Sequence, residues 1–160
     1  MNITEIIYRA YYWATTNPPI NQSTTTSVFS EGGKYFLLDV KEENGALDES
    51  KYELTEEQFG AVCGKAEELN IIESIEKLNA LNVPEPMMVG GASGSTIAIT
   101  ADGSTIVTGK SDEAISQFIK ELLFLRDSFK ATAQGEWVCE NCGFKHNKGN
   151  FCTECGSAKK

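Results

Sequence analysis

The chain has 160 residues, of which 41% are hydrophobic and 23% charged, and its formal net charge is −9. This composition is typical of a globular protein, and no apolar run reaches the length of a membrane span. Residues 1–135 hold 10 Lys/Arg against 20 Asp/Glu, whereas residues 136–160 hold four Lys against three Glu. Because an acidic surface repels phosphates, no membrane partner is expected, and nucleic acid could contact only the tail.

The N-terminal segment, MNITEIIYRAYYW, has no basic residues ahead of its apolar ones and carries an acid at Glu5. A secretory signal peptide begins with a basic region, so we expect the protein to be cytoplasmic. Residues 3–14 are rich in β-branched and aromatic side chains and predict a strand. Alternation places Ile7, Tyr11 and Trp13 on one face of that strand.

Two further strands are predicted over residues 23–30 and 34–41, joined as a hairpin across Glu31-Gly32-Gly33. In the second of them, one alternating set is wholly apolar (Phe36, Leu38, Val40) and the other is mixed (Leu37, Asp39, Lys41). Residues 51–54 predict a short edge strand that follows a turn at Asn44-Gly45.

A first helix is predicted to follow Thr55, because Thr55 and Gln58 match the capping-box pattern. Its apolar positions recur at helical spacing and include Cys63. We expect Cys63 to be a buried, unreactive thiol, since no cationic neighbour is present to lower its pKa. Residues 71–88 are ambiguous: Ile71, Ile75 and Leu78 have helical spacing, but Pro84 and Pro86 end any regular element.

The stretch GGASGS, residues 90–95, lacks the lysine and the following helix of a phosphate-binding loop, and it is interpreted as a flexible loop. Residues 95–109 predict a hairpin across Asp102-Gly103, a sequence suited to a type I′ turn. Ser111 or Asp112 is expected to cap a second helix. Its apolar face would hold Ile115, Phe118, Ile119, Leu122, Leu125 and Phe129.

These elements predict an α+β fold, with an antiparallel sheet of five or six strands and two helices on one face. We expect this domain to occupy residues 1–130. The small and polar segment 131–136 is expected to be a linker, and residues 137–160 are expected to form a separate metal-binding module.

The tail contains two Cys-x-x-Cys pairs, Cys139 with Cys142 and Cys152 with Cys155. In a reducing compartment, clustered cysteines suggest a metal site rather than disulfides. Two such pairs on short hairpins supply four thiolates in a tetrahedron, the ligand set of one structural zinc ion. Four thiolates also bind iron, and a disulfide pair and a redox Cys-x-x-Cys are the remaining competing assignments.

The segment CENCGFKHNKGNFCTECG, residues 139–156, resembles the short zinc ribbons at the ends of many bacterial proteins. The resemblance covers residues 136–158 and implies zinc, two small hairpins and an adaptor or docking role. The order of elements in residues 2–130, with the LTEEQ helix start, is similar to small bacterial domains of unknown function.

The tail is also similar to the zinc fingers of nuclear-pore and ubiquitin-binding proteins, which begin W-x-C-x-x-C and place an aromatic residue where Phe144 stands. That family requires Asn where this chain has His146, and it has ten residues between its second and third cysteines, whereas this chain has nine. These departures argue against binding of ubiquitin or single-stranded RNA.

Among the other tail residues, His146 is expected to be exposed and not a ligand, because four thiolates complete a tetrahedron. Trp137 and Phe151 are expected to cover the metal site, although stacking on a base or a partner side chain is the alternative. Four lysines are too few for a phosphate groove.

No catalytic set is recognisable. Residues 1–135 contain no histidine, so Ser–His and Cys–His pairs are excluded there. A metal with four protein ligands has no open position for activating water. We therefore expect a non-enzymatic adaptor whose ribbon docks onto another protein. The alternatives are nucleic-acid binding through the ribbon and a small-ligand site in residues 1–130.

Overall fold

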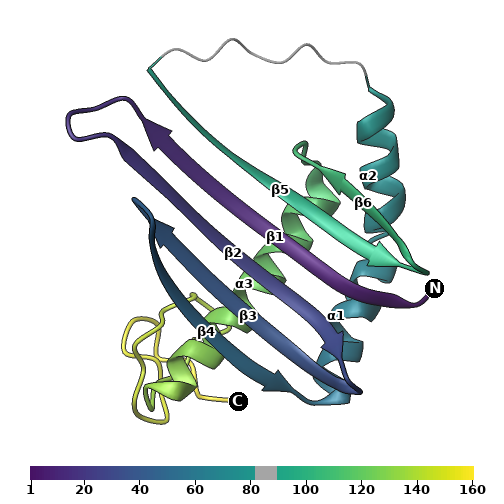
Figure 1. The fold of residues 1–160 in the computed structure, drawn as a ribbon. Helices are drawn as coiled ribbons and strands as arrows, with labels where there is room; N and C mark the ends of the chain where they lie inside the picture. The colour runs from purple at the N-terminus through teal and green to yellow at the C-terminus, as the bar shows by residue number, and fades with distance from the viewer. Residues whose placement is uncertain (82–89) are drawn as a thin grey trace. The chain divides into compact units, whose positions relative to one another are not determined.

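The computed structural model describes residues 1–81 and 90–160 (Figure 1). The chain divides into two compact units, Met1–Ile119 and Lys120–Lys160. We call these the sheet unit and the ribbon unit. Residues 82–89, which include Pro84 and Pro86, lie outside the described residues, so the interruption predicted there stays a prediction. No helix in the described part of the chain has the length and apolar character needed to cross a membrane.

The sheet unit contains one antiparallel sheet of six strands in the order β4-β3-β2-β1-β5-β6 (Figure 1). The strands are β1 (Ile3–Ala14), β2 (Ile20–Glu31), β3 (Lys34–Glu43), β4 (Ala46–Leu54), β5 (Gly91–Ala101) and β6 (Ser104–Thr108). Every predicted strand is present, and β4 is longer than the four-residue edge strand that was expected.

Three of the hairpins turn through two residues that both have positive φ: Gly32-Gly33, Asn44-Gly45 and Asp102-Gly103. Turns of this kind match the twist of the strands on either side, and residues other than glycine, asparagine and aspartate rarely adopt them. The local sequence therefore determines the register of the β2–β3, β3–β4 and β5–β6 pairs.

The helices are α1 (Glu56–Glu68), α2 (Ile71–Ala80) and α3 (Glu113–Ala133). The α+β prediction is confirmed, but there are three helices and not two. The additional helix, α2, forms because Ile71 and Ile75 are fully buried. Asn70, at φ 51°, turns the chain between α1 and α2. The predicted capping box at Thr55 is present, and Asp112 accepts a hydrogen bond from the Ile115 N–H at 2.8 Å to cap α3.

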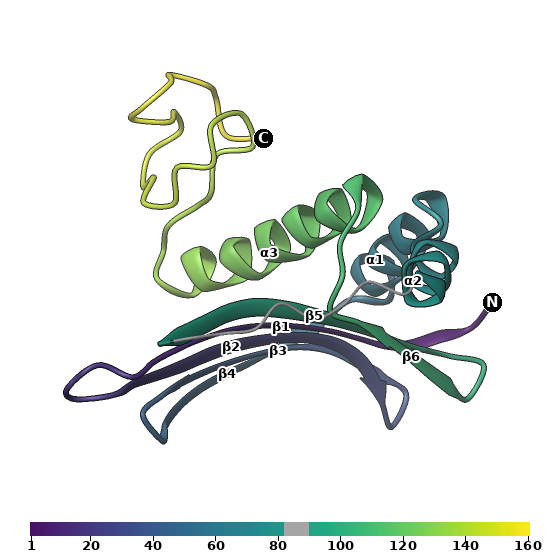
Figure 2. The ribbon, with the colours of Figure 1, turned by 90° about the horizontal axis from the view of Figure 1, so that it is seen from above.

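The core of the sheet unit lies on the face that α1 and α2 cover (Figure 2). The buried residues of this face pair across neighbouring strands as Ile99–Ile6–Val28–Leu37, and each of these four has 0% exposure. Tyr35 on the same face stacks on Phe59 of α1, with ring centroids 4.5 Å apart. The opposite face of the sheet carries no described helix of this unit.

The loop prediction for residues 90–95 is wrong, because β5 begins at Gly91 and pairs with β1 along its length. Glycine has a packing role here that the loop interpretation missed. A Cβ at Gly94 would lie 2.5 Å from the hydroxyl of Tyr11, its partner in β1. The missing side chain therefore leaves room for the tyrosine ring against the strand.

The expected linker, residues 131–136, includes the last residues of α3, which ends at Ala133. Ala131 is buried, so the helix continues because it has a packing surface there. The division of the chain into a separately folded domain and a tethered module stays a prediction.

Candidate metal centre

The ribbon unit is built from the second half of α3 followed by two tight turns that each carry a cysteine pair. In the first turn, the Gly143 N–H donates to the Cys139 carbonyl at 2.8 Å. In the second, the Gly156 N–H donates to the Cys152 carbonyl at 2.9 Å. Both glycines have φ near 75°, the left-handed region that glycine adopts most easily. Glycine therefore suits the position that follows each cysteine pair.

These two turns bring the four cysteine sulfurs together, and all four lie within 4.8 Å of one another. Cys139 Sγ is 3.6 Å from Cys155 Sγ, and Cys142 Sγ is 3.5 Å from Cys152 Sγ. A tetrahedral metal with bonds of about 2.3 Å places its sulfurs about 3.8 Å apart, whereas a disulfide requires about 2 Å. All four cysteines are free thiols, and they form a group that can hold a metal ion.

Among the described residues, this group is the only such cluster of three or more His, Cys, Asp or Glu side chains. Cys139 and Cys152 are buried, and Cys142 and Cys155 are exposed. The buried pair packs with Trp137 and Phe144 in the small core of the ribbon. An ion held here would have two ligands in that core and two at the surface.

The sulfurs differ in how readily they lose a proton. Contacts from the side chains of Asn141 and Ser157 lower the pKa of Cys155 to about 5. Burial raises the pKa of Cys152, but the backbone N–H groups of Cys155 and Glu154 outweigh it, so the net shift is downward.

The Phe144 N–H lowers the pKa of Cys142, yet burial and the three neighbouring sulfurs raise it to about 12. A bound cation would draw the remaining protons from the group. Cys152 and Cys155, whose pKa values are lowered, therefore lose a proton more readily than Cys142 does.

The ribbon is held together by Asn147, which is completely buried. Its Nδ2 donates to the carbonyls of Phe144 at 3.0 Å and Trp137 at 3.4 Å. Its Oδ1 accepts from the N–H of Thr153 at 3.0 Å. This one amide joins the first hairpin to the second turn. The spacing of the cysteines does not predict this role for Asn147.

The two aromatic residues expected to cover the site behave differently. Trp137 is 9% exposed, and its Nε1 donates to the Gly149 carbonyl at 2.6 Å, so its expected packing role is confirmed. Phe151 is 64% exposed, so the prediction is wrong for this residue. Phe151 pairs with Ala158 through an isolated bridge, which fixes its backbone without covering its ring.

His146 lies outside the cysteine group and is exposed, as expected. Its Nδ1 is 2.9 Å from Glu136 Oε2, and Lys148 approaches the same carboxylate at 3.8 Å. Lys160 pairs with Glu140 at 2.9 Å. Most of the positive charge in the tail is therefore matched by carboxylates of the tail itself or of α3.

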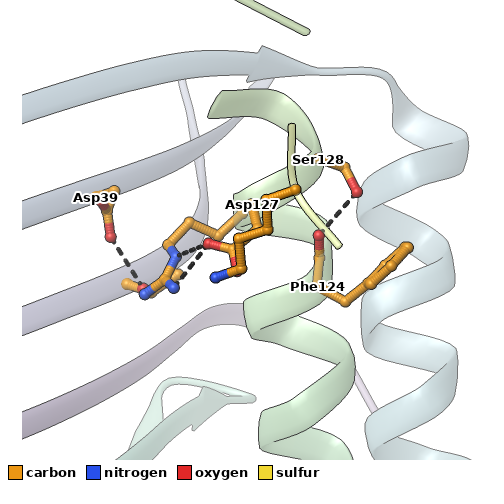
Figure 3. Close-up of polar contacts among 7 residues, drawn as sticks. Asp39, Phe124, Asp127 and Ser128 are labelled. Atoms are coloured by element: carbon orange, nitrogen blue, oxygen red, sulfur yellow. Dashed lines mark hydrogen bonds and ion pairs between the residues drawn. The ribbon is translucent and has the colours of Figure 1, made fainter. Parts of the chain in front are cut away.

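The contact with α3 is made by Asp127, which is mostly buried (Figure 3). Its Oδ1 accepts from Arg126 Nε at 3.0 Å and Nη2 at 2.8 Å, and its Oδ2 pairs with Lys145 of the first cysteine turn at 2.5 Å. Burial raises the pKa of Asp127, but the hydrogen bonds from Lys145 and Arg126 outweigh it and hold the pKa below its usual value. The carboxylate therefore ties the ribbon to the helix.

A groove of about 710 Å³ lies between α3 and the ribbon, inside the ribbon unit. Phe124, Ser128 and Thr132 form the helical wall at intervals of four residues. The Ser128 hydroxyl donates to the Phe124 carbonyl at 2.8 Å (Figure 3), and the Thr132 hydroxyl donates to the Ser128 carbonyl at 2.9 Å, so this wall presents mainly carbon.

The ribbon wall of the groove includes Val138 and Ala158. The residues on either side of these two form backbone hydrogen bonds within the ribbon; they are Trp137, Cys139, Ser157 and Lys159. Within the described residues, the backbone groups of Val138 and Ala158 form no backbone hydrogen bond. The groove thus combines an apolar wall with unpaired backbone edges.

In the sheet unit, Cys63 is half-buried in α1, and burial together with nearby Glu67 raises its pKa to about 11. This agrees with the expected unreactive thiol. The adjacent acids Glu56-Glu57 and Glu67-Glu68 are exposed and belong to the solvated side of α1.

Comparison of the chain with protein-family models, with curated proteins and with solved structures found no significant match.

Proposed function

We propose that this protein is a non-enzymatic docking protein that holds one structural zinc ion through Cys139, Cys142, Cys152 and Cys155. The observation that carries the proposal is the meeting of the four sulfurs at metal-binding distances. Four protein ligands leave no position for a substrate or an activated water, so the ion would serve the fold. Zinc is proposed because a closed set of four thiolates is the ligand set of structural zinc, and iron, which binds the same ligands, is the alternative that the metal analysis tests.

The metal content of the purified chain tests the first half of the proposal. We expect one zinc per chain by plasma mass spectrometry, and none in the Cys152→Ser, Cys155→Ser double variant. Cobalt exchanged into the site should give the intense visible spectrum of tetrahedral thiolate coordination. Stoichiometric iron would overturn the zinc assignment, and absence of any metal from freshly purified protein would overturn the site.

The groove supports the docking role. Unpaired backbone edges at Val138 and Ala158 suit an extended peptide that adds a strand, and the ring of Phe124, which is 37% exposed, offers an apolar contact beside them. The nucleic-acid alternative is weakened because Lys145, Lys148 and Lys160 are each within ion-pair distance of a carboxylate.

A nuclease-treated lysate provides the test of docking. Wild-type protein is compared with Phe124→Asp in the groove and with Phe151→Asp, a matched substitution at an exposed position that does not line the groove. We expect a protein partner that wild type and Phe151→Asp retain and that Phe124→Asp loses. Equal capture by all three would remove the groove from the proposal.

A further inference from the structure

The sheet unit has a second surface whose residue pattern does not fit exposure to water. In β3 the wholly apolar set Phe36, Leu38 and Val40 does not face the helices. The residues that do are Leu37, at 0% exposure, and Asp39, at 3%. Antiparallel sheets with one solvated face normally carry polar residues on it. In β3 the more apolar side thus faces away from the core, and such departures from the expected pattern occur at functional sites.

The same face continues across the neighbouring strands. Leu38 pairs with Ser27, Ser27 with Ile7, Ile7 with Ala98, and Ala98 with Val107, so these five residues form a row over five strands. β1 adds Ile7, Tyr11 and Trp13 to this face, together with the charged residues Glu5 and Arg9. Val107 is 54% exposed and Trp13 is 37% exposed.

Beside this row, aromatic rings and paired charges lie on the same face along β2, β3 and β4. Phe29 and Phe36 lie 5.6 Å apart, centroid to centroid. The ammonium of Lys51 is 4.0 Å from the Phe36 ring and 3.4 Å from a carboxylate oxygen of Glu31. Lys34 pairs with Glu53 at 3.2 Å. Apolar side chains and mutually paired charges thus lie side by side on this face, a mixture that non-obligate protein interfaces also carry.

The charge on this face suits a second copy of the same chain. By strand register the face carries three cations and five carboxylates: Arg9, Lys34 and Lys51 against Glu5, Glu31, Glu42, Glu49 and Glu53. Its net charge is therefore −2, out of −9 for the whole chain. Two such faces repel each other less than the more acidic remainder of residues 1–135 would.

The size of the face also suits a stable pair. Six strands about 4.8 Å apart and roughly ten residues long present on the order of 900 Å², and a standard interface needs about 800 Å² from each partner. We propose that two chains associate through these faces, sheet against sheet. The helix-free face of each monomer is then the core of a two-sheet sandwich, and Leu38 and Ile7 lie near the centre of the buried area.

Sedimentation of the zinc-loaded full chain tests the proposal. We expect wild type to sediment as a dimer at micromolar concentrations and Leu38→Glu to sediment as a monomer. Leu81→Glu is the matched control, because Leu81 is 54% exposed and lies outside the sheet; it should stay dimeric. Should Leu38→Glu lose its cooperative melt, Leu38→Thr is the second variant, because threonine is β-branched and strands favour such side chains. It should still weaken the dimer at least tenfold.

Two outcomes would refute the dimer: a wild-type monomer throughout the concentration range, or unchanged dimerisation in folded Leu38→Glu and Leu38→Thr. The Cys152→Ser, Cys155→Ser variant separates this inference from the metal site. Because the sheet face contains no metal ligand, loss of zinc should leave the dimer intact. Dissociation on metal loss alone would place the interface on the ribbon and contradict the proposal.

Discussion

At the scale of single residues, the ribbon depends on a few side chains that each satisfy several backbone groups. So small a unit has little apolar core, and here that core consists of Trp137, Phe144 and the two buried cysteines. Asn147 adds specificity, because its buried amide hydrogen-bonds to both cysteine turns. A buried amide with all its partners is stabilising, whereas the partners left behind by its removal are costly.

Replacing Asn147 with alanine should therefore weaken the ribbon even though no metal ligand is changed. We expect a cost of about 1–3 kcal/mol, from the unsatisfied Thr153 N–H and Phe144 carbonyl. Because metal binding and folding are coupled, zinc affinity measured against a chromophoric chelator should fall about tenfold or more. Asn150→Ala is the matched control, since Asn150 is exposed and contributes only its backbone carbonyl. Equal affinities in the two variants would show that Asn147 is not needed.

At the scale of elements, α3 is longer than either of the other helices and belongs to both units. Its first turns bury Ile115 and Phe118 in the sheet unit, and its last turns carry Asp127 and the helical wall of the groove. The helix extends past the expected boundary because the ribbon unit gives its last turns something to pack against.

The Asp127→Asn variant tests whether this carboxylate attaches the ribbon to α3. We expect faster proteolysis near Gly135 and a loss of about 1 kcal/mol, the size typical of partly exposed ion pairs. The pKa of Asp127 is lowered in the fold, so its contribution is complete above the unfolded pKa of about 3.9 and is lost only as the pH falls through the folded value.

The difference between wild type and Asp127→Asn should accordingly be constant from about pH 6 to about pH 8. Asp48→Asn, at an exposed position in β4, is the control and should match wild type. A difference that grows or vanishes within this range would assign the effect to another titrating group.

At the scale of the whole molecule, the chain combines a large unit with a small one that contains the four clustered cysteines. Its two tryptophans report on them separately, because Trp13 lies in β1 and Trp137 in the ribbon core. In Trp13→Phe, a chelator should shift the emission of Trp137 to the red as the ribbon unfolds. In Trp137→Phe, the emission of Trp13 and the cooperative melt should not change. A chelator-induced shift in Trp13 would mean that the units share a core and that the predicted boundary near residue 131 is wrong.

The sequence by itself determined the features that depend on neighbouring residues. The turns at Asn44-Gly45 and Asp102-Gly103 require positive φ, the Thr55–Gln58 pair caps α1 locally, and each Cys-x-x-Cys-Gly forms its own turn. Spacing was therefore enough to predict the strands, the cap and the meeting of the four cysteines.

Only the tertiary structure decided which faces are covered. α2 exists because Ile71 and Ile75 find a core, and Gly91–Ser95 is a strand because β1 pairs with it. The burial of Asp39 in place of Leu38 depends on which side of the sheet the helices occupy. Alternation divides a strand into two faces but does not say which one meets the core, because that choice is made by elements far away in the sequence.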